Sequence, residues 1–231
     1  MKYILWDIDG TLIRTGGASL KSLEQAMIDL YGQEIKIDFS CAGRTDPFIA
    51  NELFKKLTNC ANLDPTKEIP AILNRYLEIL PTLIETHKHL GTILPNVQDI
   101  LEHLNELDTC TSVLLTGNIA KGARAKLTAY NINHFFNYEL SGFGDKHDIR
   151  NNIAADCFQK IRLADPSATP DDLFVVGDTL HDIACANHIG ARCIAVATNN
   201  VTSVEALAQA NPWHVCQELP CPTTFAKLIS Y

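Results

Sequence analysis

Short apolar runs that end abruptly in polar clusters recur along this chain, with helical patterns between them. The runs occupy residues 3–6, 112–115, 173–176 and 193–196, and a shorter one lies near residues 138–140. Runs of this length without polar positions are typical of strands that are buried on both faces, as in parallel sheets. Strands that alternate with helices imply right-handed crossover connections. We therefore predict an α/β fold with a Rossmann-like, doubly wound parallel sheet.

Between the first two runs the sequence takes on helical spacing. Apolar residues recur every three or four positions within residues 20–30, 48–57 and 72–84, and Pro81 is expected to kink or divide the last of these helices. The Gly16-Gly17 pair before the block and the stretch from Gly91 to Pro95 after it are plausible hinges. We predict that residues 16–88 form an all-helical domain, inserted after the first strand of a core made of residues 1–15 and 89–231.

Charge and composition narrow the range of partners. The net charge is −8 with no run of Lys or Arg, which argues against binding to nucleic acid. No stretch approaches the roughly 20 apolar residues of a membrane span, and the first ten residues carry two carboxylates where a signal peptide would be apolar. The eight cysteines form no CxxC pair, which favours reduced thiols. We expect a cytoplasmic protein, a monomer or small homo-oligomer, with a small-molecule ligand and no membrane partner.

Three of the predicted strands end in polar clusters that could form one site. The clusters are Asp7-Ile8-Asp9-Gly10-Thr11, then Thr116-Gly117-Asn118, then Gly177-Asp178-Thr179 followed by Asp182. In open parallel sheets, ligands bind at the carboxyl ends of the strands. Four carboxylates gathered there would repel one another unless a cation lay among them, and an oxygen-rich set suits Mg²⁺ better than zinc.

Each cluster also has a purely structural interpretation. Asp-x-Asp-Gly after a strand is often a turn, because Asp and Gly readily adopt turn dihedrals. Asn118 could cap the next helix, and Asp182 could be an exposed acid in the first turn of a helix. Three such clusters in order, each at a strand end, favour the functional interpretation.

The ordered motifs resemble those of the haloacid dehalogenase superfamily, in its phosphatase branch. The matching stretches are WDIDGTL, LLTGN and VVGDTLHDIACANHIGA. The predicted helical insertion is similar to that family's cap of the phosphoglycolate phosphatase type. The resemblance implies a hydrolase with an α/β core and a helical cap that closes over the site.

The resemblance also implies a role for each residue of the motifs. Asp7 would attack phosphorus and form an aspartyl-phosphate, and Asp9 would protonate the leaving oxygen and then activate water. The ligands of Mg²⁺ would be Asp7, the main-chain carbonyl of Asp9, and Asp178, with Asp182 acting directly or through water. The phosphate oxygens would be bound by Gly10, Thr116, Gly117 and Asn118.

A basic residue is expected between the second and third clusters to pair with Asp7 and the phosphate. The common Lys-Pro form is absent, and the segment GFGDKHDIRNNI offers Lys146 and Arg150 instead. We favour Arg150, because it opens a predicted helix and its planar guanidinium can contact a carboxylate and a phosphate together. Lys146 is the alternative.

Residues 41–46 lie between two predicted helices of the cap and resemble the loop that this class lowers over the site. Gly43 would permit close approach, and Arg44 would bind an anionic group of the leaving moiety. The alternative is that Thr45 or Asp46 merely caps the next helix and that Arg44 is solvated.

These inferences predict a magnesium-dependent phosphatase that acts on a small phosphorylated metabolite, with phosphoglycolate as one guess. The presence of Asp9 argues against dehalogenation, because that reaction has no alkoxide leaving group to protonate and the dehalogenase branch lacks this acid. The alternatives are a sugar-phosphate mutase, which must protect its aspartyl-phosphate from water, and a binding module without turnover.

Overall fold

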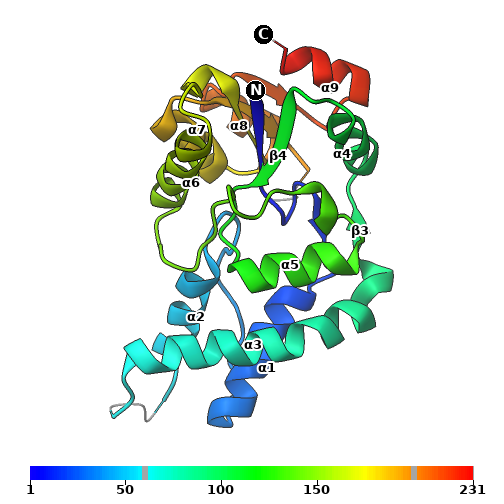
Figure 1. The fold of residues 1–231 in the computed structure, drawn as a ribbon. Coiled ribbons are helices and arrows are strands. Elements are labelled where there is room, and N and C mark those ends of the chain that lie inside the picture. The colour runs from blue at the N-terminus through cyan, green and yellow to red at the C-terminus, as the bar shows by residue number, and fades with distance from the viewer. Residues whose placement is uncertain (59–61, 199–201, 231) are drawn as a thin grey trace.

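The computed structural model describes residues 1–58, 62–198 and 202–230, and its centre is a five-stranded sheet (Figure 1). The strands are β1 (Lys2–Trp6), β4 (Cys110–Leu114), β5 (Leu173–Gly177), β6 (Arg192–Val196) and β7 (His214–Cys216). They run in the order β4-β1-β5-β6-β7, and all neighbours are parallel. The predicted α/β class with a parallel sheet is confirmed.

Both faces of the sheet are buried, as the unbroken apolar runs predicted. In β1, Ile4 and Trp6 join a cluster under α4 (Val97–Asn105) and α9 (Pro222–Leu228). Tyr3 and Leu5 alternate with them and join the opposite cluster, which is covered mainly by α6 (Arg150–Ala164) and α7 (Leu180–Ile189). Side chains two apart on a strand share a face, so β1 contributes to both layers (Figure 1).

The short strand expected at residues 138–140 is absent from the structure. These residues form a turn, and only an isolated bridge joins Leu115 to Gly142. The Asn137 carboxamide oxygen accepts hydrogen bonds from the backbone N–H groups of Glu139 and Leu140, at 3.1 and 3.2 Å. A local side-chain acceptor therefore satisfies backbone groups that a strand would have paired in the sheet.

In their described part, residues 18–58 and 62–87 hold helices and no strand. They are α1 (Ala18–Tyr31), α2 (Asp46–Lys55) and α3 (Pro65–His87), which pack around one apolar cluster of their own below the sheet (Figure 1). Pro81 lies inside α3 and does not divide it, and the alternative, a kink at Pro81, stays a prediction. We call these three helices the helical layer; its identification as a separate cap domain with the bounds 16–88 stays a prediction.

Two short strands connect the helical layer to the sheet. β2 (Ile13–Arg14) leads into it and β3 (Thr92–Ile93) leads out, and the two pair antiparallel with Ile13 opposite Ile93. Between layer and sheet lies α5 (Ala120–Ala129), which packs against α3 (Figure 1). The remaining elements are α8 (Val204–Gln209) and the 3-10 turns at Lys88–Leu90, Asn133–Phe135 and Pro170–Asp172. Within the described ranges, no helix has the length and apolarity needed to cross a membrane.

Candidate active site

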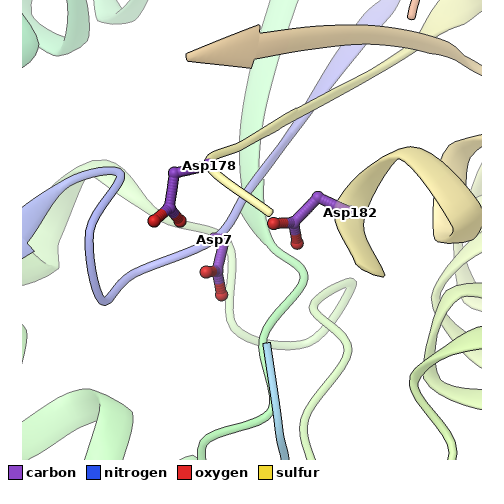
Figure 2. Close-up of side chains that lie close together, drawn as sticks. All are labelled: Asp7, Asp178 and Asp182. Carbon is purple, nitrogen blue, oxygen red and sulfur yellow. The ribbon is translucent and has the colours of Figure 1, made fainter. Parts of the chain in front are cut away.

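The three polar clusters meet at the carboxyl edge of the sheet because β1 lies between β4 and β5. Trp6, the last residue of β1, is level with Leu114 of β4 and Val176 of β5. The segments that leave these three strands therefore start side by side. Figure 2 shows Asp7, Asp178 and Asp182 converging from two of them.

Three buried carboxylates form the centre of this site. One oxygen each from Asp7, Asp178 and Asp182 lies within 4.8 Å of the others. Asp178 accepts a hydrogen bond from the Thr11 hydroxyl at 3.0 Å. Asp182 is held by the capping box of α7, in which its carboxylate accepts from the Thr179 N–H at 3.0 Å and from the Thr179 hydroxyl at 2.6 Å.

The chemistry of these donors fits a hard divalent cation. All three are carboxylates, the preferred ligands of Mg²⁺, and all three are buried. Desolvation raises the pKa of Asp7 well above its ordinary range, and the charges of Asp182, Asp178 and Asp9 raise it further, against the lowering effect of Arg150. One guanidinium thus does not offset the negative charge gathered here, and a bound cation would. Each of the three also has a protein partner: Asp7 and Asp182 pair with Arg150, and Asp178 accepts from Thr11.

Arg150 lies in the site and Lys146 does not. The Arg150 side chain is 6% exposed, its Nη2 is 3.3 Å from Asp7 Oδ1, and it also pairs closely with Asp182. Lys146 is exposed on the preceding loop, and its ammonium makes no ion pair or hydrogen bond within the described part of the chain. The geometry therefore favours Arg150 of the two alternatives.

Asp9 points into a second, adjoining group of polar side chains. Its Oδ2 accepts hydrogen bonds from Asn118 Nδ2 at 2.8 Å and from Lys126 Nζ at 2.7 Å. Asn118 Nδ2 also lies 2.9 Å from the hydroxyl oxygen of Thr116. The carboxylate of Asp9 is thus not among the three that converge on the cation site, and the role of its main-chain carbonyl there stays a prediction.

Lys126 is a site residue that sequence reasoning missed. It lies within α5, eight residues after Asn118 and outside the three motifs, and it is one of two lysines on that helix. A signal was present: Lys126 occupies the same face as Ala123 and Leu127, which are core residues. A lysine on the buried face of a helix is rarely left without a buried partner of opposite charge.

Two glycines of the polar clusters, Gly10 and Gly117, allow close approach of charged or polar groups. Gly10 has φ of 92°, and a Cβ there would overlap the carboxylate of Asp178. A Cβ on Gly117 would overlap the carbonyl oxygen of Arg44. The loop of residues 41–46 therefore lies directly against the segment that follows β4.

The contacts of this loop show that Thr45, and not Asp46, caps the helix that follows. Thr45 is the N-cap of α2 and accepts from the Phe48 N–H at 3.2 Å, whereas Asp46 is the first residue of the helix. Asp46 instead bridges to the core: its carboxylate accepts from the Ile119 N–H at 2.9 Å, and its own N–H donates to Gly117 O at 2.9 Å. Desolvation in this position raises the pKa of Asp46 to about 6, against the opposing charge of Lys126.

Gly117→Ala is expected to lower kcat/KM at least about tenfold. The methyl group would displace residues 41–46 from the core, and overpacking of this kind costs about 1–3 kcal/mol. Steady-state kinetics and the midpoint of thermal unfolding measure the two effects. A variant with wild-type kinetics would show that the contact between this loop and Gly117 is irrelevant to the active state.

A cavity of about 410 Å³ opens between the helical layer and the edge of the sheet. Its floor is lined by Asp7, Asp9, Thr116, Lys126 and Arg150, and the opposite wall combines side chains of the helical layer with those of the loop at residues 41–44. These wall residues are Ser19, Leu20, Leu23, Cys41, Arg44, Asp46 and Ile49. Arg44 lies over the ring of Phe48, with 4.6 Å between the guanidinium carbon and the ring centroid.

A parallel sheet whose carboxyl edge gathers acids beneath a helical layer defines an α/β enzyme fold. Residues 4–196 match the model of the haloacid dehalogenase-like hydrolase family. Because the match covers most of the chain, the chain belongs to this family, and the resemblance noted from its motifs is confirmed. No match was found among curated protein sequences.

Solved structures share the fold at low sequence identity. A mutant of CbbY from Rhodobacter sphaeroides, in complex with xylulose-1,5-bisphosphate, has a TM-score of 0.74 at 15% identity over 94% of each chain. A predicted phosphatase from Clostridium acetobutylicum has a TM-score of 0.70 at 16% identity, with 100% of this chain and 99% of that chain covered. A predicted phosphoglycolate phosphatase from Haemophilus somnus has a TM-score of 0.68 at 18% identity, with 100% and 97% covered.

Proposed function

We propose that this enzyme is a magnesium-dependent phosphatase that hydrolyses a small phosphorylated metabolite through an aspartyl-phosphate on Asp7. The observation that carries the proposal is the convergence of the Asp7, Asp178 and Asp182 carboxylates, with Arg150 beside Asp7 and Asp9 nearby. The family of the chain and the phosphatases among its structural relatives support it.

The reaction would proceed in two steps at phosphorus. An oxygen of Asp7 forms a bond to phosphorus while the bond to the leaving oxygen breaks, and Asp9 gives that oxygen its proton. Water then attacks the phosphorus of the aspartyl-phosphate, Asp9 takes a proton from the water, and the Asp7 carboxylate departs. Asp9 ends each step in the state that the next one requires.

The other residues would hold the phosphoryl group in line. Arg150 would contact Asp7 and a phosphate oxygen together, while Thr116 and the backbone N–H groups of Gly10, Gly117 and Asn118 would bind the remaining oxygens. Mg²⁺, held by Asp7, Asp178 and the carbonyl of Asp9 with support from Asp182, would neutralise charge that builds up during phosphoryl transfer.

The cavity limits the leaving group to a small molecule. About 410 Å³ suits a metabolite of modest size, and pockets for such ligands commonly measure 300–1,000 Å³. Arg44, with Gly43 beside it, would bind an anionic substituent of the leaving moiety. Phosphoglycolate is one candidate among the small phosphorylated acids and sugars.

A panel of phosphorylated metabolites tests the proposal through release of inorganic phosphate. We expect hydrolysis with Mg²⁺ and none with EDTA. Hydrolysis that requires an added acceptor sugar phosphate would instead favour the mutase. No turnover across phosphorylated acids, sugars, nucleotides and an aryl phosphate would contradict the proposal.

Mg²⁺ is expected to raise the midpoint of thermal unfolding, and by more at pH 8.5 than at pH 6. Because the pKa of Asp7 is raised, the metal-free protein loses stability as pH climbs from the ordinary carboxyl value of about 4 toward the raised value. At acidic pH the cation must also displace a proton from Asp7. At 100 times its dissociation constant the ion would add about 2.7 kcal/mol.

Thermal unfolding with Mg²⁺ or EDTA at a series of pH values measures this effect, with Asp178→Asn as the variant expected to lose most of it. A stabilisation that shrinks as pH rises would contradict the proposed site.

A further inference from the structure

Lys126 carries an ammonium group that is almost completely buried. The side chain is 2% exposed, and it lies within α5 between the sheet and α3 (Figure 1). Burial of an unpaired charge is costly, so a buried lysine requires partners that compensate for the lost water. Because it is anchored in the middle of a packed helix, the position of this ammonium is set by the fold.

The partners of Lys126 are residues of the active site. Its Nζ donates to Asp9 Oδ2 at 2.7 Å and makes a close hydrogen bond to Asn118 Oδ1. Asn118 in turn donates from Nδ2 to the same oxygen of Asp9, at 2.8 Å. The three side chains form a closed triangle in which two rigidly placed donors converge on a single oxygen atom.

This arrangement fixes one oxygen of Asp9 and leaves the other to act. Both donors use Oδ2, and within the described ranges no hydrogen bond was found at Oδ1. The Asp9 side chain is 42% exposed, and both it and Lys126 line the cavity. Rotation of the carboxylate away from the cavity would break both hydrogen bonds at once.

We propose that Lys126 is a positioning residue for the general acid and base Asp9, which it anchors through Oδ2 so that Oδ1 exchanges the proton with the leaving oxygen and then with water. The inference rests on the proposed phosphatase function. A competing role for Lys126 is purely structural, as the counter-charge of the buried Asp46. The two roles differ in which substrates are affected when the ammonium is removed.

The test compares a poor and a good leaving group in wild type, Lys126→Met and Lys126→Arg. Phenyl phosphate needs a proton on its leaving oxygen, whereas 2,4-dinitrophenyl phosphate does not. We expect Lys126→Met to lower kcat/KM for phenyl phosphate by about 100-fold, within the range of general acid catalysis. The loss of kcat/KM for 2,4-dinitrophenyl phosphate should be less than about fivefold, because this constant reports only the steps up to release of the first product.

The second step gives a separate readout. Hydrolysis of the aspartyl-phosphate also needs Asp9, as the base, so Lys126→Met should lower kcat for both substrates. Rapid mixing with 2,4-dinitrophenyl phosphate should then show a burst of dinitrophenolate, stoichiometric with enzyme, before slow turnover. Asp9→Asn should reproduce both patterns, and Lys126→Arg, which keeps a cationic donor, should recover part of the loss.

Equal losses of kcat/KM for the two substrates in Lys126→Met, without a burst, would overturn the proposal and leave the structural role. Asp46→Asn/Lys126→Met removes both buried charges. If Lys126→Met alone does not fold, this double variant takes its place in the comparison of the two aryl phosphates. If wild type hydrolyses neither aryl phosphate nor any phosphometabolite, the proposed function fails rather than this inference.

Discussion

Asp7→Asn is expected to reduce turnover by at least about 10⁴-fold, to the background of the assay. A carboxamide oxygen is a poor nucleophile, and no aspartyl-phosphate can form without the carboxylate at the end of β1. The substitution also removes a proposed ligand of Mg²⁺. Phosphate release from the best substrate of the panel measures the loss, and acid quenching with labelled substrate should trap phosphoenzyme in wild type alone.

The fold of Asp7→Asn should be preserved, which separates chemistry from stability. Desolvation and the neighbouring acids raise the pKa of Asp7, so its charged form costs stability in the metal-free protein near neutral pH. An amide carries no such cost. The thermal midpoint of the variant in EDTA should therefore equal or exceed that of wild type.

Asp108→Asn is the matched control, because Asp108 is exposed just before β4 begins, at the opposite edge of the sheet. It should keep full activity. Activity above a few per cent in Asp7→Asn would rule out Asp7 as the nucleophile.

Arg150→Ala is expected to lower kcat/KM by about 10³-fold, while Lys146→Ala leaves it within about twofold. The guanidinium of Arg150 contacts Asp7 and Asp182, and its loss would remove a partner of the proposed nucleophile and a proposed contact to the phosphate. Lys146 is exposed on the loop and serves as the control. Steady-state kinetics on the same substrate measure both variants, and the reverse result would reassign the basic residue.

Stability should also separate the two variants. Arg150→Ala leaves two buried carboxylates without their counter-charge, and breaking a buried pair in this way costs about 3–5 kcal/mol. Chemical denaturation in EDTA should show this cost, and Mg²⁺ should offset part of it. Arg150→Lys keeps the positive charge but loses the planar pair of donors. We expect this variant to fold and to have an activity between those of wild type and Arg150→Ala.

Much of the core was predictable because its signals are local. An apolar run of four or five residues that is buried on both faces reads as a strand without reference to the rest of the chain. The polar clusters follow these runs directly, so the carboxyl edge of the sheet and its three acidic or hydroxyl-bearing segments were predicted together. The strand order then brought Asp7, Asp178 and Asp182 together as expected.

Features that depend on distant partners were not predictable. The last strand, β7, is short and only partly buried, and it exists because it pairs with β6. Pro81 was expected to kink or divide its helix, but α3 continues through it, because α3 is held against α1 and α5 and packing of this kind outweighs the loss of one backbone hydrogen bond. In both cases tertiary contacts decided the local structure.

The sequence by itself determined the parallel sheet, the family, and the residues that converge at the ends of three strands, because these follow from the order of apolar and polar residues along the chain. The sequence favoured Arg150 but left Lys146 open as the basic residue beside Asp7, and only the tertiary structure placed Arg150 there and Lys126 against Asp9. Arg150 reaches Asp7 from the start of α6, after a long connection, and Lys126 reaches Asp9 from the middle of α5, so packing of these helices fixes the direction of both side chains. The positive charges beside Asp7 and Asp9 thus come from residues outside the three motifs.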